Sequence, residues 1–86
     1  MTVEILTPEG KLFSQDVYGV QLPGTAGLFE VLDHHAPLVS SLGKGQVKIL
    51  LDKSGNENQK FEIKSGFVEV LNNKVTVLVE GASAAS

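Results

Sequence analysis

Residues 59–64 read Gln-Lys-Phe-Glu-Ile-Lys, and this stretch shows the pattern that decides the fold. On an extended chain Phe61 and Ile63 lie on one face, while polar or charged side chains occupy the other. Apolar residues at every second position are typical of a half-buried β-strand, whereas a helix repeats them every three or four residues. The same alternation recurs at residues 46–51 and 75–80, where the side chains that share a face are Val47, Ile49, Leu51, Val75, Val77 and Val79.

Other extended segments flank these strands and are predicted at residues 3–7, 16–22 and 67–71. Stretches rich in glycine, proline or asparagine separate the segments and predict turns at residues 8–10, 23–27, 52–58, 65–66 and 72–73. Residues 36–42 fit either one helical turn or a short strand, and no segment has the pattern of a long amphipathic helix. Short strands at this spacing predict an all-β sandwich or barrel.

The composition bounds the size and class of the protein. With 86 residues the chain forms one domain at most. Its net charge of −3 and its lack of arginine argue against nucleic-acid binding, because arginine is the preferred side chain for phosphates and base edges. The absence of cysteine excludes disulfides and thiolate sites. No apolar run approaches the ~20 residues of a membrane helix, and no signal peptide is recognisable, so we expect a cytoplasmic chain without direct membrane insertion.

Side chains that suggest chemistry have simpler explanations. His34 and His35 are adjacent, so on a strand they point to opposite faces and are not expected to share a metal ion. The glycine-rich residues 24–27 lack the lysine and following helix of a phosphate-binding loop, and residues 43–45 (Gly-Lys-Gly) are followed by a predicted strand, not by a helix. Gly19, inside a predicted strand, indicates either a bulge or the close approach of another backbone. No serine lies in a strand-turn-helix elbow, so we expect no catalytic residue, no metal and no cofactor.

Residues 28–32, Leu-Phe-Glu-Val-Leu, allow two interpretations. Four apolar side chains surround one acid directly after a predicted loop. They form either a buried strand or an apolar edge that is offered to a partner.

Residues 23–42 resemble the signature of the epsilon subunit of the F-type ATP synthase. That family typically shows Pro-Gly-x-x-Gly-x-Phe-Gly-Val-Leu followed by Gly-His-Ala-Pro-Leu. Residues 5–14 are similar to the family's first hairpin, and residues 65–70 and 73–78 are similar to later blocks. The resemblance covers residues 3–80 in the family's order, and it is the order of the blocks that makes it specific.

The resemblance implies a two-layer β-sandwich of short, mostly antiparallel strands, with the domain at residues 1–81 and a flexible tail at residues 82–86. It implies a non-catalytic rotor subunit of the central stalk, which joins the gamma subunit to the c-ring as a peripheral part on the cytoplasmic face of the membrane. By the same resemblance Leu28 and Glu30 are expected nearest the c-ring. The residues expected nearer gamma are His35, Ala36, Pro37 and Leu38.

The chain departs from the family pattern in two respects. Leu28 stands where an acid is common, Glu30 where glycine is common, and Asp33-His34 replaces Pro-Gly, so the contacts of this region are expected to differ chemically. The sequence also ends at Ser86, before the C-terminal helical hairpin of most members. Regulatory inhibition and nucleotide binding belong to that hairpin, so neither is expected here.

A stand-alone ligand-binding β-sandwich of another family, such as a carbohydrate or peptide binder, is the alternative. Sugar-binding proteins usually present exposed tryptophan or tyrosine rings. This chain has no tryptophan and a single tyrosine, Tyr18, which favours the rotor subunit.

Overall fold

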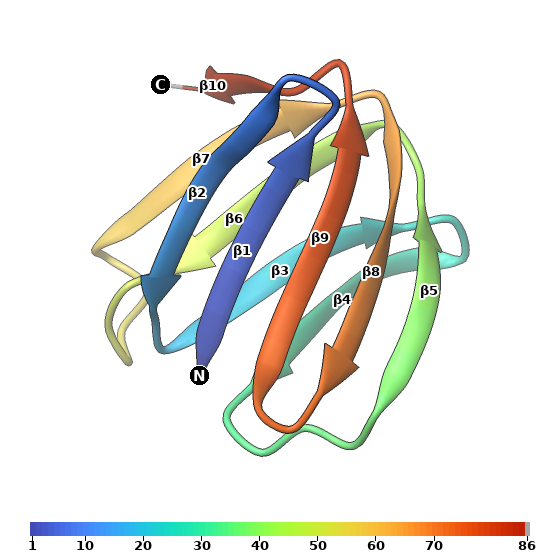
Figure 1. Ribbon diagram of the computed structural model, residues 1–86. Coiled ribbons are helices and arrows are strands. Elements are labelled where there is room, and N and C mark those ends of the chain that lie inside the picture. Colours follow the sequence, from blue (N-terminus) through green and yellow to red (C-terminus); the bar gives the residue numbers. More distant parts are fainter. Residues whose placement is uncertain (86) are drawn as a thin grey trace.

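Ten β-strands and no helix form residues 1–85, the part of the chain that the computed structural model describes (Figure 1). The strands are β1 (Thr2–Thr7), β2 (Gly10–Asp16), β3 (Gly19–Gly24), β4 (Gly27–Leu32), β5 (Leu38–Leu42), β6 (Gly45–Leu50), β7 (Asn58–Ile63), β8 (Ser65–Leu71), β9 (Lys74–Glu80) and β10 (Ser83–Ala85). The segment predicted at residues 16–22 is in fact divided by a corner at Val17 and Tyr18. The undecided residues 36–42 contribute a strand, β5, and no helical turn.

All ten strands belong to one hydrogen-bonded sheet, which curls back on itself into two layers (Figure 1). One layer has the order β5-β8-β9-β1-β2, and the other has β4-β3-β6-β7-β10. The layers meet where β3 and β5 pair at Gly24 and Leu42. Neighbouring strands are antiparallel except β1 and β9, which run parallel. The expected fold class, an all-β two-layer sandwich of mostly antiparallel strands, is confirmed.

The interior between the layers is apolar throughout the described residues, and no polar or charged residue there is buried. Phe61 and Ile63 are each 2% exposed, and Val47, Ile49, Val75, Val77 and Val79 are also buried, as the alternation predicted. Leu51 follows the end of β6 and is only half-buried against the core. The rings of Phe13 on β2 and Phe61 on β7 meet edge to face, with centroids 5.8 Å apart, so an aromatic contact joins the two layers.

Close backbone approach explains two glycines. A Cβ atom on Gly19 would lie 3.1 Å from the carbonyl oxygen of Val31 on the neighbouring strand β4, and β3 pairs with β4 without a bulge, so the choice left open by the sequence is resolved as close approach. A Cβ atom on Gly66 would collide with the carbonyl oxygen of Leu78. Neither glycine has a positive φ, so the backbone conformation does not require glycine. The lack of space for a Cβ atom is what favours glycine at both positions.

The segment expected to be a flexible tail contains β10, which pairs with Lys60–Glu62 of β7. The last residue, Ser86, lies outside the described residues. The domain boundary at residue 81 and the mobility of the tail stay predictions.

The core assignment predicts that Phe61→Ala lowers the free energy of unfolding by ~3–5 kcal/mol, because it leaves a cavity between the layers and removes the contact with Phe13. Urea denaturation followed by circular dichroism measures this change. Phe67→Ala is the matched control, because Phe67 is 58% exposed and its truncation is expected to change stability by less than ~1 kcal/mol. Equal losses of stability in the two variants would show that the faces are wrongly assigned.

Candidate partner interface

Strand β4 directs its side chains alternately inward and outward, and this resolves the two interpretations of residues 28–32. Val31 is fully buried and Phe29 packs against the core, as expected for a strand of the sandwich. Leu28 is 71% exposed on the opposite face. Glu30 shares that outer face, where its Oε1 accepts a hydrogen bond of 2.9 Å from Nε2 of Gln21 on β3. The strand therefore serves the core and also presents Leu28 and Glu30 to the outside.

The predicted interface residues are spread along β4, where Glu30 lies in the middle, and along the segment that follows it. Leu28 is at its start, whereas His35, Ala36 and Pro37 belong to the loop of residues 33–37 that follows its end. Six residues of strand span roughly 20 Å at ~3.3 Å per residue. The structure therefore places Leu28 apart from His35, Ala36 and Pro37, and does not bring all the predicted residues into one patch.

A larger apolar surface lies on the outer side of the first layer, over β5, β8 and β9. Val39, Phe67 and Leu78 are 74%, 58% and 50% exposed, and we call these three residues the outer apolar face. Phe67 and Leu78 are paired across β8 and β9. They line a shared hollow of about 500 Å³ with Leu6 and Pro8. Large exposed apolar groups that lie together mark a site for a partner more often than isolated ones do.

The loop that follows β4 is continuous with the outer apolar face. A smaller hollow, of about 250 Å³, is lined by Pro37 and Leu38 together with Val39 and Leu71. Val39 thus belongs both to this hollow and to the outer apolar face. Pro37, Leu38 and the outer apolar face therefore form one extended surface.

Sequence reasoning missed Phe67 and Leu78, although a signal for them was present. Val68 and Val70 face inward, so Phe67 must face outward on the same strand. Likewise Val77 and Val79 face inward, which leaves Leu78 outside. A large apolar side chain at an outward position of two paired strands is the pattern that would have identified this surface.

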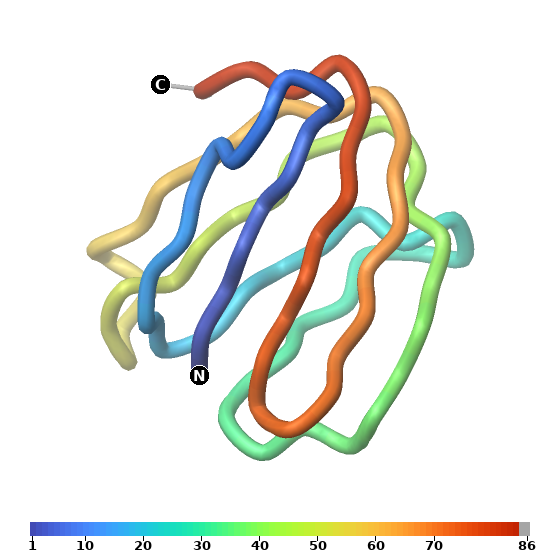
Figure 2. The backbone as a smooth tube through the Cα atoms, viewed as in Figure 1, coloured from blue at the N-terminus to red at the C-terminus, as the bar shows by residue number. Residues whose placement is uncertain are grey.

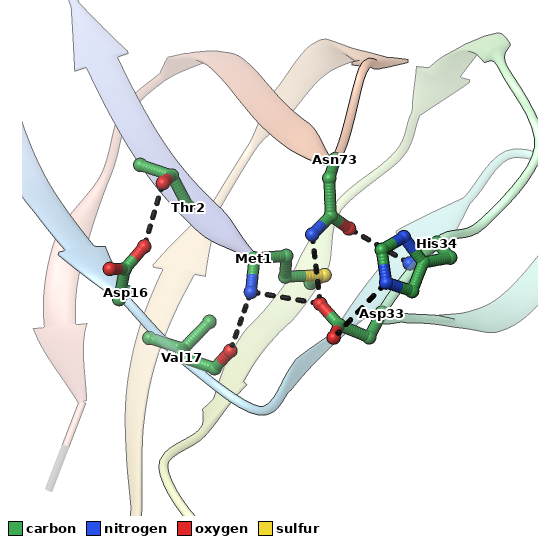
Figure 3. Close-up of polar contacts among 7 residues, drawn as sticks. All are labelled: Met1, Thr2, Asp16, Val17, Asp33, His34 and Asn73. Carbon is green, nitrogen blue, oxygen red and sulfur yellow. Dashed lines mark hydrogen bonds and ion pairs between the residues drawn. The ribbon is translucent and has the colours of Figure 1, made fainter.

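The loop of residues 33–37 is attached to the rest of the fold by polar contacts (Figure 3). Oδ1 of Asp33 accepts hydrogen bonds of 3.0 Å from the Met1 ammonium group and of 3.0 Å from Nδ2 of Asn73. Oδ1 of Asn73 accepts a 2.8 Å bond from the backbone N–H of His34. The start of β1, the loop and the turn between β8 and β9 therefore meet at one end of the sandwich, as Figure 2 shows.

Electrostatics at this loop favour an ionised carboxylate. The Met1 ammonium, and after it the Asn73 amide, lower the pKa of Asp33 below its ordinary value of 3.8. Because the pKa of Asp33 is lower in the folded protein, the ionised carboxylate stabilises the fold at pH values above 3.8. This stabilisation is lost as the pH falls through the lower pKa of the folded state. The contacts of Asp33 are therefore fully formed at neutral pH.

The geometry shows binding features and no catalytic constellation within residues 1–85. The carboxylates with a shifted pKa are Glu4, Asp33 and Asp52, and each is lowered, chiefly by Lys11, the Met1 ammonium and the Ser54 hydroxyl respectively. A general acid at neutral pH requires the opposite shift. In the same residues no three His, Cys, Asp or Glu side chains lie close enough to hold a metal ion. Nor do they include any helix able to span a membrane.

Comparison with known proteins identifies the family. Residues 1–85 match the family described as ATP synthase, Delta/Epsilon chain, beta-sandwich domain. The ATP synthase epsilon chain of Maridesulfovibrio salexigens is 42% identical over 85 residues, which are 99% of this chain and 58% of that protein. The epsilon chain of Chlorobaculum tepidum is 42% identical over 82 residues, which are 95% of this chain and 91% of that protein.

The fold agrees with this match. A chain in the structure of the Tetrahymena thermophila mitochondrial ATP synthase central stalk and c-ring superposes with a TM-score of 0.81, at 18% identity, over 96% of this chain and 65% of that chain. The chain spans about three fifths of the Maridesulfovibrio protein's length. From the family match and the two sequence relatives, the chain belongs to the β-sandwich domain family of the ATP synthase delta and epsilon chains.

Proposed function

We propose that the chain is a non-catalytic rotor subunit in the central stalk of a proton-translocating F-type ATP synthase. In this role it couples the gamma subunit to the c-ring during ATP synthesis, as a peripheral part on the cytoplasmic face of the membrane. The observation that carries the proposal is the match of residues 1–85 to the delta and epsilon chain family. The relatives, which are ATP synthase epsilon chains, and the similar fold of a chain in an ATP synthase central-stalk structure support it.

The gamma subunit is proposed to bind the outer apolar face together with Pro37 and Leu38. This surface combines large exposed apolar side chains with hollows that a partner's side chains can fill. Burial of such groups supplies most of the favourable free energy of association. An aromatic anchor at the centre of an interface usually dominates the affinity, and Phe67 is the aromatic residue of this face.

The c-ring is proposed to meet the outer side of β4, through Leu28 and Glu30. Leu28 offers an exposed apolar side chain, and Glu30 offers a carboxylate that Gln21 orients. Leu28 lies at the other end of β4 from the loop of residues 33–37, and the Glu30 side chain projects from the outer face of β4 between them. One small domain can thus contact two partners without competition between them.

The proposal predicts that the purified chain shows no ATPase activity and joins its own gamma subunit in a one-to-one complex. Sedimentation equilibrium of mixed samples measures the stoichiometry, and a coupled ATPase assay measures the activity. ATP hydrolysis by the chain alone, or a chain that stays monomeric when mixed with gamma, would contradict the proposal.

Phe67→Asp is expected to weaken gamma binding by on the order of a hundredfold, because it places a charge in an apolar contact. Its melting temperature is expected to stay within a few degrees of the unmodified chain, since Phe67 lies outside the core. Leu12→Asp is the matched control: Leu12 is an exposed apolar residue on β2 that lines neither hollow. Isothermal titration with gamma measures both affinities, and an equal loss in the two variants would exclude the outer apolar face as the site.

Leu28→Asp is expected to weaken assembly with the c-ring while leaving the melting temperature of the isolated domain almost unchanged, because Leu28 points away from the core. Val31→Asp, on the same strand, is expected to unfold the domain, because Val31 is fully buried. Thermal unfolding and reconstitution of the complex test the pair. A drop of many degrees in the Leu28→Asp variant would mean that Leu28 is part of the core.

A further inference from the structure

The turn between β8 and β9 is hydrogen-bonded to the loop of residues 33–37 through the side chain of Asn73. We infer that Asp33, His34 and Asn73 form a clamp that holds this loop in place for its partner, and that Asn73 is the positioning residue of the clamp. The link to a partner rests on the proposed function, whereas the clamp itself rests on the geometry alone.

Both the nitrogen and the oxygen of the Asn73 side-chain amide form hydrogen bonds with the loop. Its Nδ2 donates to the Asp33 carboxylate at 3.0 Å, and its Oδ1 accepts from the His34 N–H at 2.8 Å. Two successive loop residues are thus held by one side chain from a turn about 40 residues further along the chain. Exchanging the amide oxygen and nitrogen would break both bonds, so the contacts fix a single orientation of the side chain.

The backbone of His34 shows why the loop needs such support. Its φ is +61°, in the left-handed region that is uncommon for residues other than glycine. The resemblance places glycine at this position, and glycine adopts a positive φ freely. In this chain Asp33-His34 stands in place of Pro-Gly. The hydrogen bonds to Asn73 therefore supply the restraint that the residue types at 33 and 34 do not supply themselves.

Further contacts tie the clamp to the body of the sandwich. Asp33 Oδ1 also accepts a bond from the Met1 ammonium, which donates to the carbonyl oxygen of Val17 at 3.3 Å. The carboxylate of Asp33 lies 3.8 Å from Nε2 of His34. The backbone N–H of Thr2 donates to the carbonyl of Asn73 at 3.2 Å. The loop is thereby linked to the start of β1 as well as to the β8–β9 turn.

The neighbouring Asn72 provides a matched control. Asn72 and Asn73 have φ values of +50° and +60° and form the two-residue turn of the β8–β9 hairpin, a position that favours asparagine and glycine. Both residues therefore tolerate replacement by glycine as far as the backbone is concerned. Within the described residues Asn72 makes no side-chain hydrogen bond. Replacing Asn73 by glycine therefore removes the clamp, whereas replacing Asn72 by glycine leaves it in place.

The test compares Asn73→Gly with Asn72→Gly in the full chain. Amide hydrogen exchange, resolved by residue with nuclear magnetic resonance, is expected to be on the order of tenfold faster at His34 and His35 in Asn73→Gly, because the N–H of His34 loses its acceptor. The melting temperatures of the two variants are expected to agree within a few degrees. Equal protection of His34 in both variants would overturn the clamp.

A second experiment measures the affinity of the same variants for gamma, and it distinguishes failure of the clamp from failure of the proposed function. The affinity of gamma is expected to fall several-fold in Asn73→Gly and to stay unchanged in Asn72→Gly. In Asp33→Ala a fall is also expected, and in the double variant with Asn73→Gly the loss of affinity should be smaller than the two separate losses combined, because the two residues share one of these hydrogen bonds. Faster exchange with unchanged affinity would overturn the positioning role. Failure of the unmodified chain to bind gamma would instead overturn the proposed function and leave the exchange result standing.

Discussion

The apolar interior between the two layers is the constraint on which the rest of the structure depends. Along the described strands the inward apolar side chains are buried in this interior or packed against it, and no buried polar group interrupts it. The layers are joined through the pairing of β3 with β5 at Gly24 and Leu42, so the fold relies on packing, including the contact between Phe13 and Phe61. Because stability resides in the inward positions, the outward positions are free to serve partners.

The strands could be predicted because their pattern is local. Period-two alternation identifies the inward face from neighbouring residues alone, and Phe61, Ile63 and Val77 are buried accordingly. Where the alternation is weak, the prediction is less precise. Residues 36–42 fitted either a helical turn or a strand. Residues 16–22 were predicted as one continuous strand, although the chain turns a corner at Val17 and Tyr18. That corner is fixed by backbone bonds to Met1 and Leu50, which lie far away in sequence.

The candidate interface was only partly predictable for the same physical reason. The outward direction of Leu28 follows from alternation, but the outer apolar face exists because β5, β8 and β9 lie side by side, and pairing between distant strands cannot be read from one segment. The clamp depends even more on contacts between distant parts of the sequence. Asp33 and Asn73 are 40 residues apart and become neighbours only when the sandwich folds. A local departure, Asp33-His34 in place of Pro-Gly, is thus compensated at a distant turn.

Purification from native membranes tests the central claim most directly. The chain is tagged at its own locus, the membranes are solubilised with a mild detergent, and the captured proteins are identified and counted by quantitative mass spectrometry. We expect one copy of the chain for each gamma subunit, together with the alpha and beta subunits and the c-ring. Recovery of the chain without gamma and the c-ring, from membranes that contain an intact synthase, would contradict it.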